Sequence, residues 1–207
     1  MKDIIRGTSP VKRSERYTYR DYRGWPADER WELIHGTPYS MSPAPRRIHQ
    51  AIVIQIAGQL DSFFAGKQCR PHIAPIDLFL DRNPDPVTAD NSAVDDLDSI
   101  DTIVQPDAFV VCDPQKLVDE GVRGAPDFVI EVLSPGTAMK DQTEKRKLYE
   151  EHRVAEYWII NPDTLELFVY ILKDDGTYGL PTVADLRDGV ESIRFKGLHI
   201  AVRPEDL

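Results

Sequence analysis

The sequence is poor in cysteine and contains no long hydrophobic run. Cys69 and Cys112 are its two cysteines, and they are too far apart to form a CxxC motif. We therefore expect no disulfide framework and interpret both as reduced core residues of a cytoplasmic protein. No apolar stretch approaches the length of a bilayer-spanning helix, and the N-terminus, MKDIIRGTSP, lacks the apolar segment of a secretory signal. The sequence therefore predicts no association with membranes.

Several catalytic signatures are also absent. The chain contains no P-loop, no GxSxG, no HExxH and no Rossmann glycine series, which argues against the enzyme classes that these motifs define. Acidic residues outnumber basic ones, and the resulting formal net charge of −10 weakens binding to a polyanion. The negative charge is not spread evenly along the chain, however. Residues 81–101 carry seven aspartates and one arginine, a net of −6, whereas residues 1–30 carry eight Lys or Arg against five Asp or Glu, a net of +3.

The pattern of apolar residues predicts one mixed α/β domain over residues 17–207, preceded by a flexible arm over residues 1–16. Residues 81–101, rich in Asp, Asn and Pro, are typical of a solvated loop. A helical turn is expected over 18–23, and longer helices over 46–64 and from Thr137 onward. Strands are expected near 30–34 and 38–41, which flank His35-Gly36 as a hairpin. Further strands are expected near 75–80, 103–112, 128–133, 155–160, 165–172 and 192–202.

The most informative stretch is an apolar strand with an acid inside it. Phe128 to Leu133 is bounded by proline and glycine, and Glu131 lies in its middle. A carboxylate there is costly to bury unless a cation compensates it. In the helix that follows, Asp141, Lys145 and Tyr149 recur every four residues and so share one face. This spacing predicts that Lys145 turns back toward Glu131.

Asp107 is a second acid inside an apolar strand, directly after Pro106. Two carboxylates from neighbouring strands repel each other, so that one takes a proton or both bind a divalent cation. Oxygen ligands suit Mg²⁺ or Mn²⁺, and the Val132 carbonyl is placed to join them. Asp127 is a poorer partner for Glu131, because four residues of one strand separate the two by about 13 Å.

Taken in order, several short motifs resemble the Uma2 family, which is placed in the PD-(D/E)xK nuclease superfamily. They are Trp31-Glu32-Leu33-Ile34-x-Gly36, Val104-Gln105-Pro106-Asp107, Pro126-Asp127-x-x-Ile130-Glu131-Val132-Leu133-Ser134-Pro135, Asp141-x3-Lys145-x3-Tyr149 and Glu156-Tyr157-Trp158. The resemblance covers residues 17–207 and implies a restriction-endonuclease-like core, a mixed sheet flanked by helices. The implied activity is metal-dependent hydrolysis of phosphodiester bonds.

Carried onto this chain, the resemblance assigns catalytic roles to Asp107, Glu131 and Lys145. Asp107 and Glu131 match the two metal-binding acids, and Glu32 matches an N-terminal acid that joins the metal shell. The superfamily's usual lysine two positions after the second acid is replaced by Leu133, so its role falls to Lys145 on the helix. His35 stands where the family often has Asp, and the acidic loop is longer than usual.

Simpler interpretations compete with these roles. Asp141 and Lys145 have the spacing of a surface salt bridge, and Glu131 with Lys145 would also form a purely structural buried pair. His49, in the first turn of a helix, is either a phosphate contact or a solvated residue. Asp77 is either a neighbour of the site or a strand end. Asp141, like His49 and Asp77, is a candidate for supporting the metal-binding acids or for contacting the substrate.

Three classes of function remain open at this point. The first is a Mg²⁺- or Mn²⁺-dependent endonuclease acting on nucleic acid, with DNA favoured. The second is a homodimeric binding protein that has kept the fold but lost turnover, which the acidic charge favours. A two-carboxylate glycosidase is disfavoured because the helix lysine has no role there. A homodimer is expected from the resemblance and from the many aromatic residues between Tyr157 and Tyr170.

Overall fold

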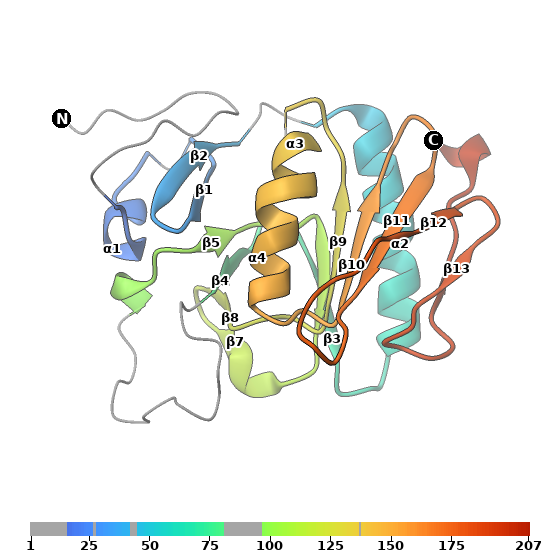
Figure 1. Ribbon diagram of the computed structural model, residues 1–207. Helices are drawn as coiled ribbons and strands as arrows, with labels where there is room; N and C mark the ends of the chain where they lie inside the picture. Colours follow the sequence, from blue (N-terminus) through green and yellow to red (C-terminus); the bar gives the residue numbers. More distant parts are fainter. Residues whose placement is uncertain (1–15, 27, 42–44, 81–96, 137) are drawn as a thin grey trace.

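The computed structural model describes residues 16–26, 28–41, 45–80, 97–136 and 138–207. Nearly all of the predicted arm, most of the acidic loop and the predicted helix cap Thr137 lie outside these residues. In the described part of the chain, two six-stranded mixed sheets combine with a two-stranded pair and a few helices (Figure 1). The predicted mixed α/β class is therefore confirmed. No helix among the described residues is long and apolar enough to cross a membrane.

The two large sheets have different strand orders. The first sheet runs β2 (Thr37–Ser40), β1 (Trp31–Ile34), β5 (Ile103–Val104), β4 (Asp77–Phe79), β8 (Gly121–Arg123) and β7 (Leu117–Val118). The second sheet runs β12 (Thr182–Asp185), β11 (Glu166–Ile171), β10 (Glu156–Ile160), β9 (Phe128–Val132), β6 (Ala108–Val111) and β3 (Arg70–Ile73). Neighbouring strands are antiparallel except for β9 with β10 and β4 with β8, which are parallel. The small pair is β13 (Val190–Glu191) with β14 (His199–Ile200).

The predicted hairpin around His35 and Gly36 joins β1 to β2 and is confirmed. Both residues have positive φ, 50° and 74°, as a two-residue hairpin turn of this kind requires. Glycine is needed at the second position for a further reason. A Cβ on Gly36 would lie 2.8 Å from the Cβ of Arg16, closer than side chains pack.

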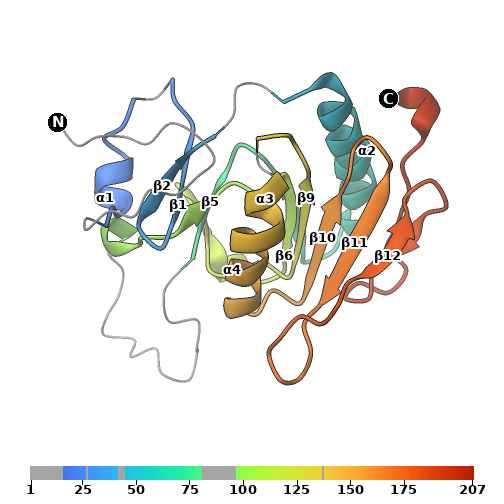
Figure 2. The ribbon, with the colours of Figure 1, turned by 45° about the horizontal axis from the view of Figure 1, so that its top comes forward.

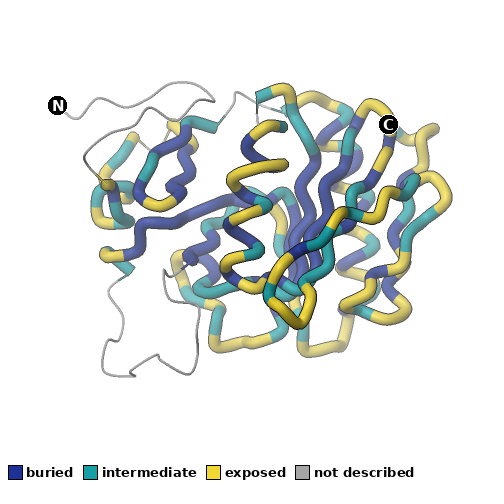
Figure 3. Tube along the Cα trace, viewed as in Figure 1, coloured by how far each residue is buried: buried dark blue, intermediate teal, exposed yellow. Residues whose placement is uncertain are grey.

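Helices cover both faces of the second sheet (Figures 1 and 2). The long helix α2 (Arg47–Phe64) packs Ile52, Ile56 and Leu60 against one face, together with Ile130 of β9. Along β9 successive side chains alternate between the faces, so Val129 joins the opposite core under the other helices. Those are α3 (Ala138–Lys140), a π-helical turn (Asp141–Lys145) and α4 (Arg146–Glu151). The central strands are buried along their length (Figure 3).

Shorter helical segments complete the fold. The predicted turn at the start of the domain is α1 (Tyr19–Tyr22), where the Asp21 carboxylate accepts a hydrogen bond from the Thr18 backbone N–H at 3.2 Å. Single 3₁₀ turns span Leu97–Ser99, Pro114–Lys116 and Pro204–Asp206.

The chain crosses between the two sheets at two neighbouring points. The expected single strand over 103–112 is instead two strands, β5 in the first sheet and β6 in the second, divided at residues 105–107. A second crossing, which includes the cis peptide bond Ala74–Pro75, lies between β3 and β4. Proline cannot donate a backbone hydrogen bond to a strand partner, so Pro106 interrupts the ladder there. The sequence prediction missed this break because apolar residues flank it on both sides.

The C-terminal expectation was also wrong. In place of one strand over 192–202, a short β13–β14 pair encloses a turn. Glu156 on β10, fully buried, holds that turn by accepting hydrogen bonds from Ser192 Oγ at 2.7 Å and from the Arg194 backbone N–H at 2.8 Å. A buried carboxylate needs several donors, and here the turn supplies them. The Glu156-Tyr157-Trp158 motif thus has a structural role.

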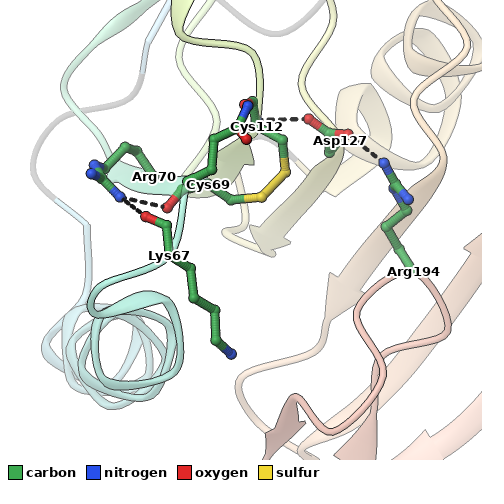
Figure 4. Close-up of a disulfide and its surroundings, with 7 residues drawn as sticks. Lys67, Cys69, Arg70, Cys112, Asp127 and Arg194 are labelled. Atoms are coloured by element: carbon green, nitrogen blue, oxygen red, sulfur yellow. Dashed lines mark hydrogen bonds and ion pairs between the residues drawn. A yellow bond between two sulfur atoms is a disulfide. The ribbon is translucent and has the colours of Figure 1, made fainter.

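The two cysteines form a disulfide, so the expectation of reduced thiols was wrong (Figure 4). Cys69 directly precedes β3 and Cys112 directly follows β6. The antiparallel register of these strands pairs Arg70 with Val111 and so brings the two cysteines opposite each other. No pattern in the sequence indicated strand β3, so this pairing was not predicted. Next to the disulfide, Asp127 accepts a hydrogen bond from the Cys112 backbone N–H at 2.9 Å and pairs with Arg194 at 2.8 Å.

Candidate active site

A cleft of about 420 Å³ opens where the chain crosses between the two sheets. Ala74, Pro75 and Gln105 from the two crossings form one wall. The start of α2 and the loop after β9 form the others. Its remaining lining residues are Arg30, Met41, Pro45, Arg46, His49, Gln50, Asp107, Glu131, Ser134, Pro135, Gly136, Asp141 and Lys145. All three predicted catalytic residues, Asp107, Glu131 and Lys145, therefore line one cleft.

Asp107 and Glu131 are joined by reciprocal contacts between backbone and side chain. Val132 N–H, next to Glu131, donates to Asp107 Oδ2 at 2.8 Å, and Asp107 N–H lies 3.4 Å from Glu131 Oε2. The backbone at the end of β9 thus binds the Asp107 carboxylate, and the backbone just before β6 contacts the Glu131 carboxylate. Asp127 pairs with Arg194 and does not line this cleft, in keeping with its rejection as the partner acid.

Lys145 approaches these acids from the π-helical turn. Its Nζ lies 2.8 Å from Glu131 Oε1, 2.9 Å from Glu32 Oε1 and 3.6 Å from Asp141 Oδ1, and its side chain is 3% exposed. Tyr149 also donates to Glu131 Oε1, at 3.0 Å. The predicted helical face is therefore buried against Glu131, although its first turn is π-helical rather than α-helical. Single π-turns are frequent at functional sites.

Glu32 lies behind the cleft rather than in its lining, and it is fully buried. One oxygen accepts from the Gln105 backbone N–H at 2.9 Å and pairs with Lys145, while the other pairs with Lys140. Lys140, 7% exposed, was not predicted. It is five residues before Lys145, a separation that puts two side chains about 140° apart on an α-helix, and the π-turn between them reduces this angle.

The charges in this cluster shift one another's pKa values. Burial raises the pKa of Glu131 to about 8 against the attraction of Lys145, and the nearby carboxylates Asp141, Asp107 and Glu32 add to the rise. Burial also acts to raise the pKa of Glu32, but the ammonium groups of Lys145 and Lys140 outweigh it and lower the pKa to about 2. Burial disfavours the Lys145 ammonium, yet Glu131, Glu32 and Asp141 raise the pKa of Lys145 well above its ordinary value.

The secondary candidates are placed in different ways. His49 is buried, lines the cleft and contacts Asp107 Oδ2 through Nε2 at 3.2 Å. Burial lowers the pKa of His49, but its contact with Asp107 outweighs this and raises the pKa overall. Asp141 lines the cleft beside Lys145. Asp77 lies outside the lining and accepts hydrogen bonds from Gln105 and Tyr22.

The donor set of the cleft fits a hard divalent cation that is bound with few protein ligands. Within the described residues, no three His, Cys, Asp or Glu side chains are grouped so that they could hold a metal by themselves. Mg²⁺, however, is commonly held by one or two carboxylates, with water and substrate phosphate oxygens completing its shell. Asp107 and Glu131 supply two carboxylates for such a shell, and a divalent cation beside them would favour the ionised form of Glu131, whose pKa burial raises.

Residues 19–203 match the sequence family Uma2, described as "Putative restriction endonuclease". The chain belongs to the Uma2 family. A crystal structure described as that of "a putative nuclease belonging to DUF820", from Anabaena variabilis, is similar with a TM-score of 0.66. That match has 20% sequence identity and covers 89% of this chain and 94% of the other, so this Uma2 protein shares its fold.

Sequence similarity to a curated protein is more limited. The "Uncharacterized protein slr1290" of Synechocystis sp. is 32% identical over 74 residues, which is 35% of this chain and 39% of that protein. Family membership therefore rests on the match over residues 19–203, which supports a nuclease-like function.

Proposed function

We propose that this Uma2 protein is a metal-dependent endonuclease that hydrolyses phosphodiester bonds of nucleic acid, with DNA as the favoured substrate. The observation that carries the proposal is the joint position of Asp107, Glu131 and Lys145 in one cleft, with the Lys145 ammonium 2.8 Å from Glu131. Two acids can hold a divalent cation, and a lysine can stabilise the negative charge that builds on the phosphate oxygens during attack.

The two acids and the lysine have different roles in the proposed hydrolysis. Asp107 and Glu131 would hold Mg²⁺ or Mn²⁺, which when bound polarises the phosphate and lowers the pKa of a nearby water. Lys145 stabilises the negative charge on the phosphate and orients the attacking water. The reaction adds water across one P–O ester bond and leaves a phosphomonoester and a free hydroxyl. Glu32, itself paired with Lys140, keeps Lys145 in place from behind. A direct role of Glu32 in the metal shell therefore requires Glu32 to exchange its lysine contacts.

A second candidate is a binding protein that has kept the fold without turnover. The observation that favours it is the burial of Lys145, whose ammonium already contacts three carboxylates. A homodimer remains part of both candidates. The aromatic residues that suggested one are partly used within the fold, because Tyr157 and Tyr170 stack at 6.0 Å beside Tyr178.

The test is cleavage of labelled single-stranded and duplex DNA and RNA, with Mg²⁺, with Mn²⁺ and with EDTA. We expect metal-dependent cleavage that falls by roughly a hundredfold or more in Asp107→Asn, Glu131→Gln and Lys145→Met. Asp61→Asn, an exposed change on α2, is the matched control. If the purified protein cleaves none of these substrates with either metal while binding them, the second candidate replaces the nuclease.

A further inference from the structure

We infer that Arg30 forms a phosphate-binding subsite at the rim of the cleft, next to the acids, and that Gln105 and Asp77 position it. The inference rests on the proposed function for its substrate, a nucleic-acid backbone, but the subsite itself is defined by its own contacts. Arg30 lies just before β1 and lines the same cleft as Asp107 and Glu131.

Arg30 is oriented by a chain of hydrogen bonds that reaches into the first sheet. Its Nε and Nη2 donate to Gln105 Oε1 at 3.2 and 2.6 Å. Gln105 Nε2 in turn donates to Asp77 Oδ1 at 2.8 Å, and the Tyr22 hydroxyl donates to the same oxygen at 3.0 Å. Gln105 is 8% exposed, and its backbone N–H is bound by the buried Glu32. The guanidinium is thus fixed by well-packed groups.

The charge of Arg30 remains available for an anion. Its hydrogen-bond partner is the neutral amide of Gln105, and in the described part of the chain no carboxylate forms an ion pair with it, so Asp77 beyond that amide attracts it only at longer range. The two other cations that line the cleft differ in this respect. Arg46 pairs with Asp163 at 3.0 Å, and Lys145 pairs with three carboxylates. A guanidinium has five N–H donors, of which Gln105 uses two, so a bidentate contact with phosphate is open to Arg30.

The position of this subsite suits a phosphate adjacent to the one that is cleaved. Gln105, which holds Arg30, is two residues before Asp107 on the same crossing between the sheets. A backbone phosphate bound by Arg30 would therefore be placed in register with the acids. Such contacts fix the position of a nucleic acid without reading its sequence. Asp77 thereby gains a role in positioning Arg30.

The test uses two probes on the full chain. In the first, the side-chain Nε–H signals of ¹⁵N-arginine are followed during titration with inorganic phosphate, and the Arg30 signal is assigned by its loss in Arg30→Gln. In the second, binding of labelled DNA is measured with Ca²⁺ over a range of salt concentrations. We expect phosphate to shift the Arg30 signal, and Arg30→Gln to weaken DNA binding by roughly tenfold or more. The salt dependence should fall by about one phosphate contact.

Three variants act as controls. Arg30→Lys keeps the positive charge but loses the planar set of N–H donors that can bind a phosphate through two hydrogen bonds. It should therefore bind DNA more tightly than Arg30→Gln but less tightly than the wild type. Gln105→Leu should weaken binding as a positioning variant, with the Arg30 signal moved before any phosphate is added. Arg46→Gln, at the other cleft arginine, should have a smaller effect because that guanidinium is already paired.

The outcomes separate this inference from the nuclease. Cleavage of DNA by the wild type with an unchanged affinity in Arg30→Gln overturns the subsite and leaves the nuclease intact. A phosphate-dependent shift of Arg30 without any cleavage supports the subsite and counts against the nuclease. If neither phosphate nor DNA affects the Arg30 signal, the subsite is overturned.

Discussion

Lys145 and Glu32 form a buried ion pair, with the ammonium nitrogen 2.9 Å from Oε1 of the carboxylate. Glu32 comes from a hairpin strand and Lys145 from the π-helical turn, so the pair ties the first sheet to the helix that carries the proposed catalytic lysine. The other oxygen of Glu32 is held by Lys140. Because Glu32 and Asp141 also hold Lys145, the loss of Glu131 alone does not leave the lysine without a counter-charge.

Removing Lys140 should destabilise the fold and misplace Lys145. In Lys140→Met, Glu32 loses one of two cations in a fully buried position, and we expect the free energy of unfolding to fall by about 3 kcal/mol or more. Lys147→Met is the matched control, since that side chain is 69% exposed and should change stability by less than about 0.5 kcal/mol. Urea denaturation of both variants checks this. Equal free energies of unfolding in the two variants would mean that the contact between Lys140 and Glu32 does not stabilise the fold.

Glu32 and Glu131 should affect the pH dependence of stability in opposite ways. The pKa of Glu32 is lowered from 4.5 to about 2, so its stabilisation is present above pH 4.5 and is lost as the pH falls toward 2. The pKa of Glu131 is raised from 4.5 to about 8, so the folded protein keeps a proton that the unfolded chain releases. The free energy of unfolding therefore falls as the pH rises from 4.5 to 8.

Unfolding curves of the wild type, Glu32→Gln and Glu131→Gln between pH 2 and 9 separate these contributions. Glu32→Gln should reduce the change in the free energy of unfolding below pH 4.5. Glu131→Gln should reduce its change between pH 4.5 and 8. The assignment would be refuted if each substitution reduced the change in the other pH range.

A divalent metal should stabilise the wild type but not the variants of the acid pair. At a free Mn²⁺ concentration of 100 times its dissociation constant, binding adds about 2.7 kcal/mol to the free energy of unfolding. Glu131→Gln and Asp107→Asn should lose this gain, while Asp61→Asn should keep it. Without metal, Glu131→Gln should be as stable as the wild type or more so, because the raised pKa of Glu131 means that the fold disfavours its charged form and glutamine carries no charge. Calorimetric titration measures metal binding, and thermal melts with and without metal measure the stability of each variant. A wild type that does not respond to Mn²⁺ or Mg²⁺ would exclude the metal site.

The disulfide should contribute measurably to stability. Cys69 and Cys112 are 43 residues apart in sequence, and closing a loop of that size stabilises a protein by about 2–4 kcal/mol through the unfolded state. We expect the Cys69→Ala, Cys112→Ala double variant to lose that amount in urea denaturation. Thiol titration of the unfolded wild type without reductant should find no free thiol. Two titratable thiols would restore the original expectation of reduced cysteines.

The local sequence determined more of the site than of the framework that holds it. Glu131 is conspicuous because a carboxylate interrupts an apolar strand, and Lys145 follows from the helical spacing behind it. The hairpin turn at His35 and Gly36 and the helix over 47–64 were also predictable. Each of these signals depends on the conformation of neighbouring residues or on the cost of burying one charged group. A short stretch of sequence is enough to recognise either one.

The tertiary structure decided which distant groups meet. Neither Lys140 nor the Arg30–Gln105 contact was predicted, because Lys140 falls outside the spacing of a regular helix and Arg30 has no periodic pattern. The disulfide depends on β3 pairing with β6 at the edge of the second sheet, and the placement of β5 and β6 in different sheets depends on the strands with which each one pairs. Such partners are chosen by the packing of whole strands and helices, and a hydrogen bond between residues 75 positions apart leaves no mark on the sequence around either one.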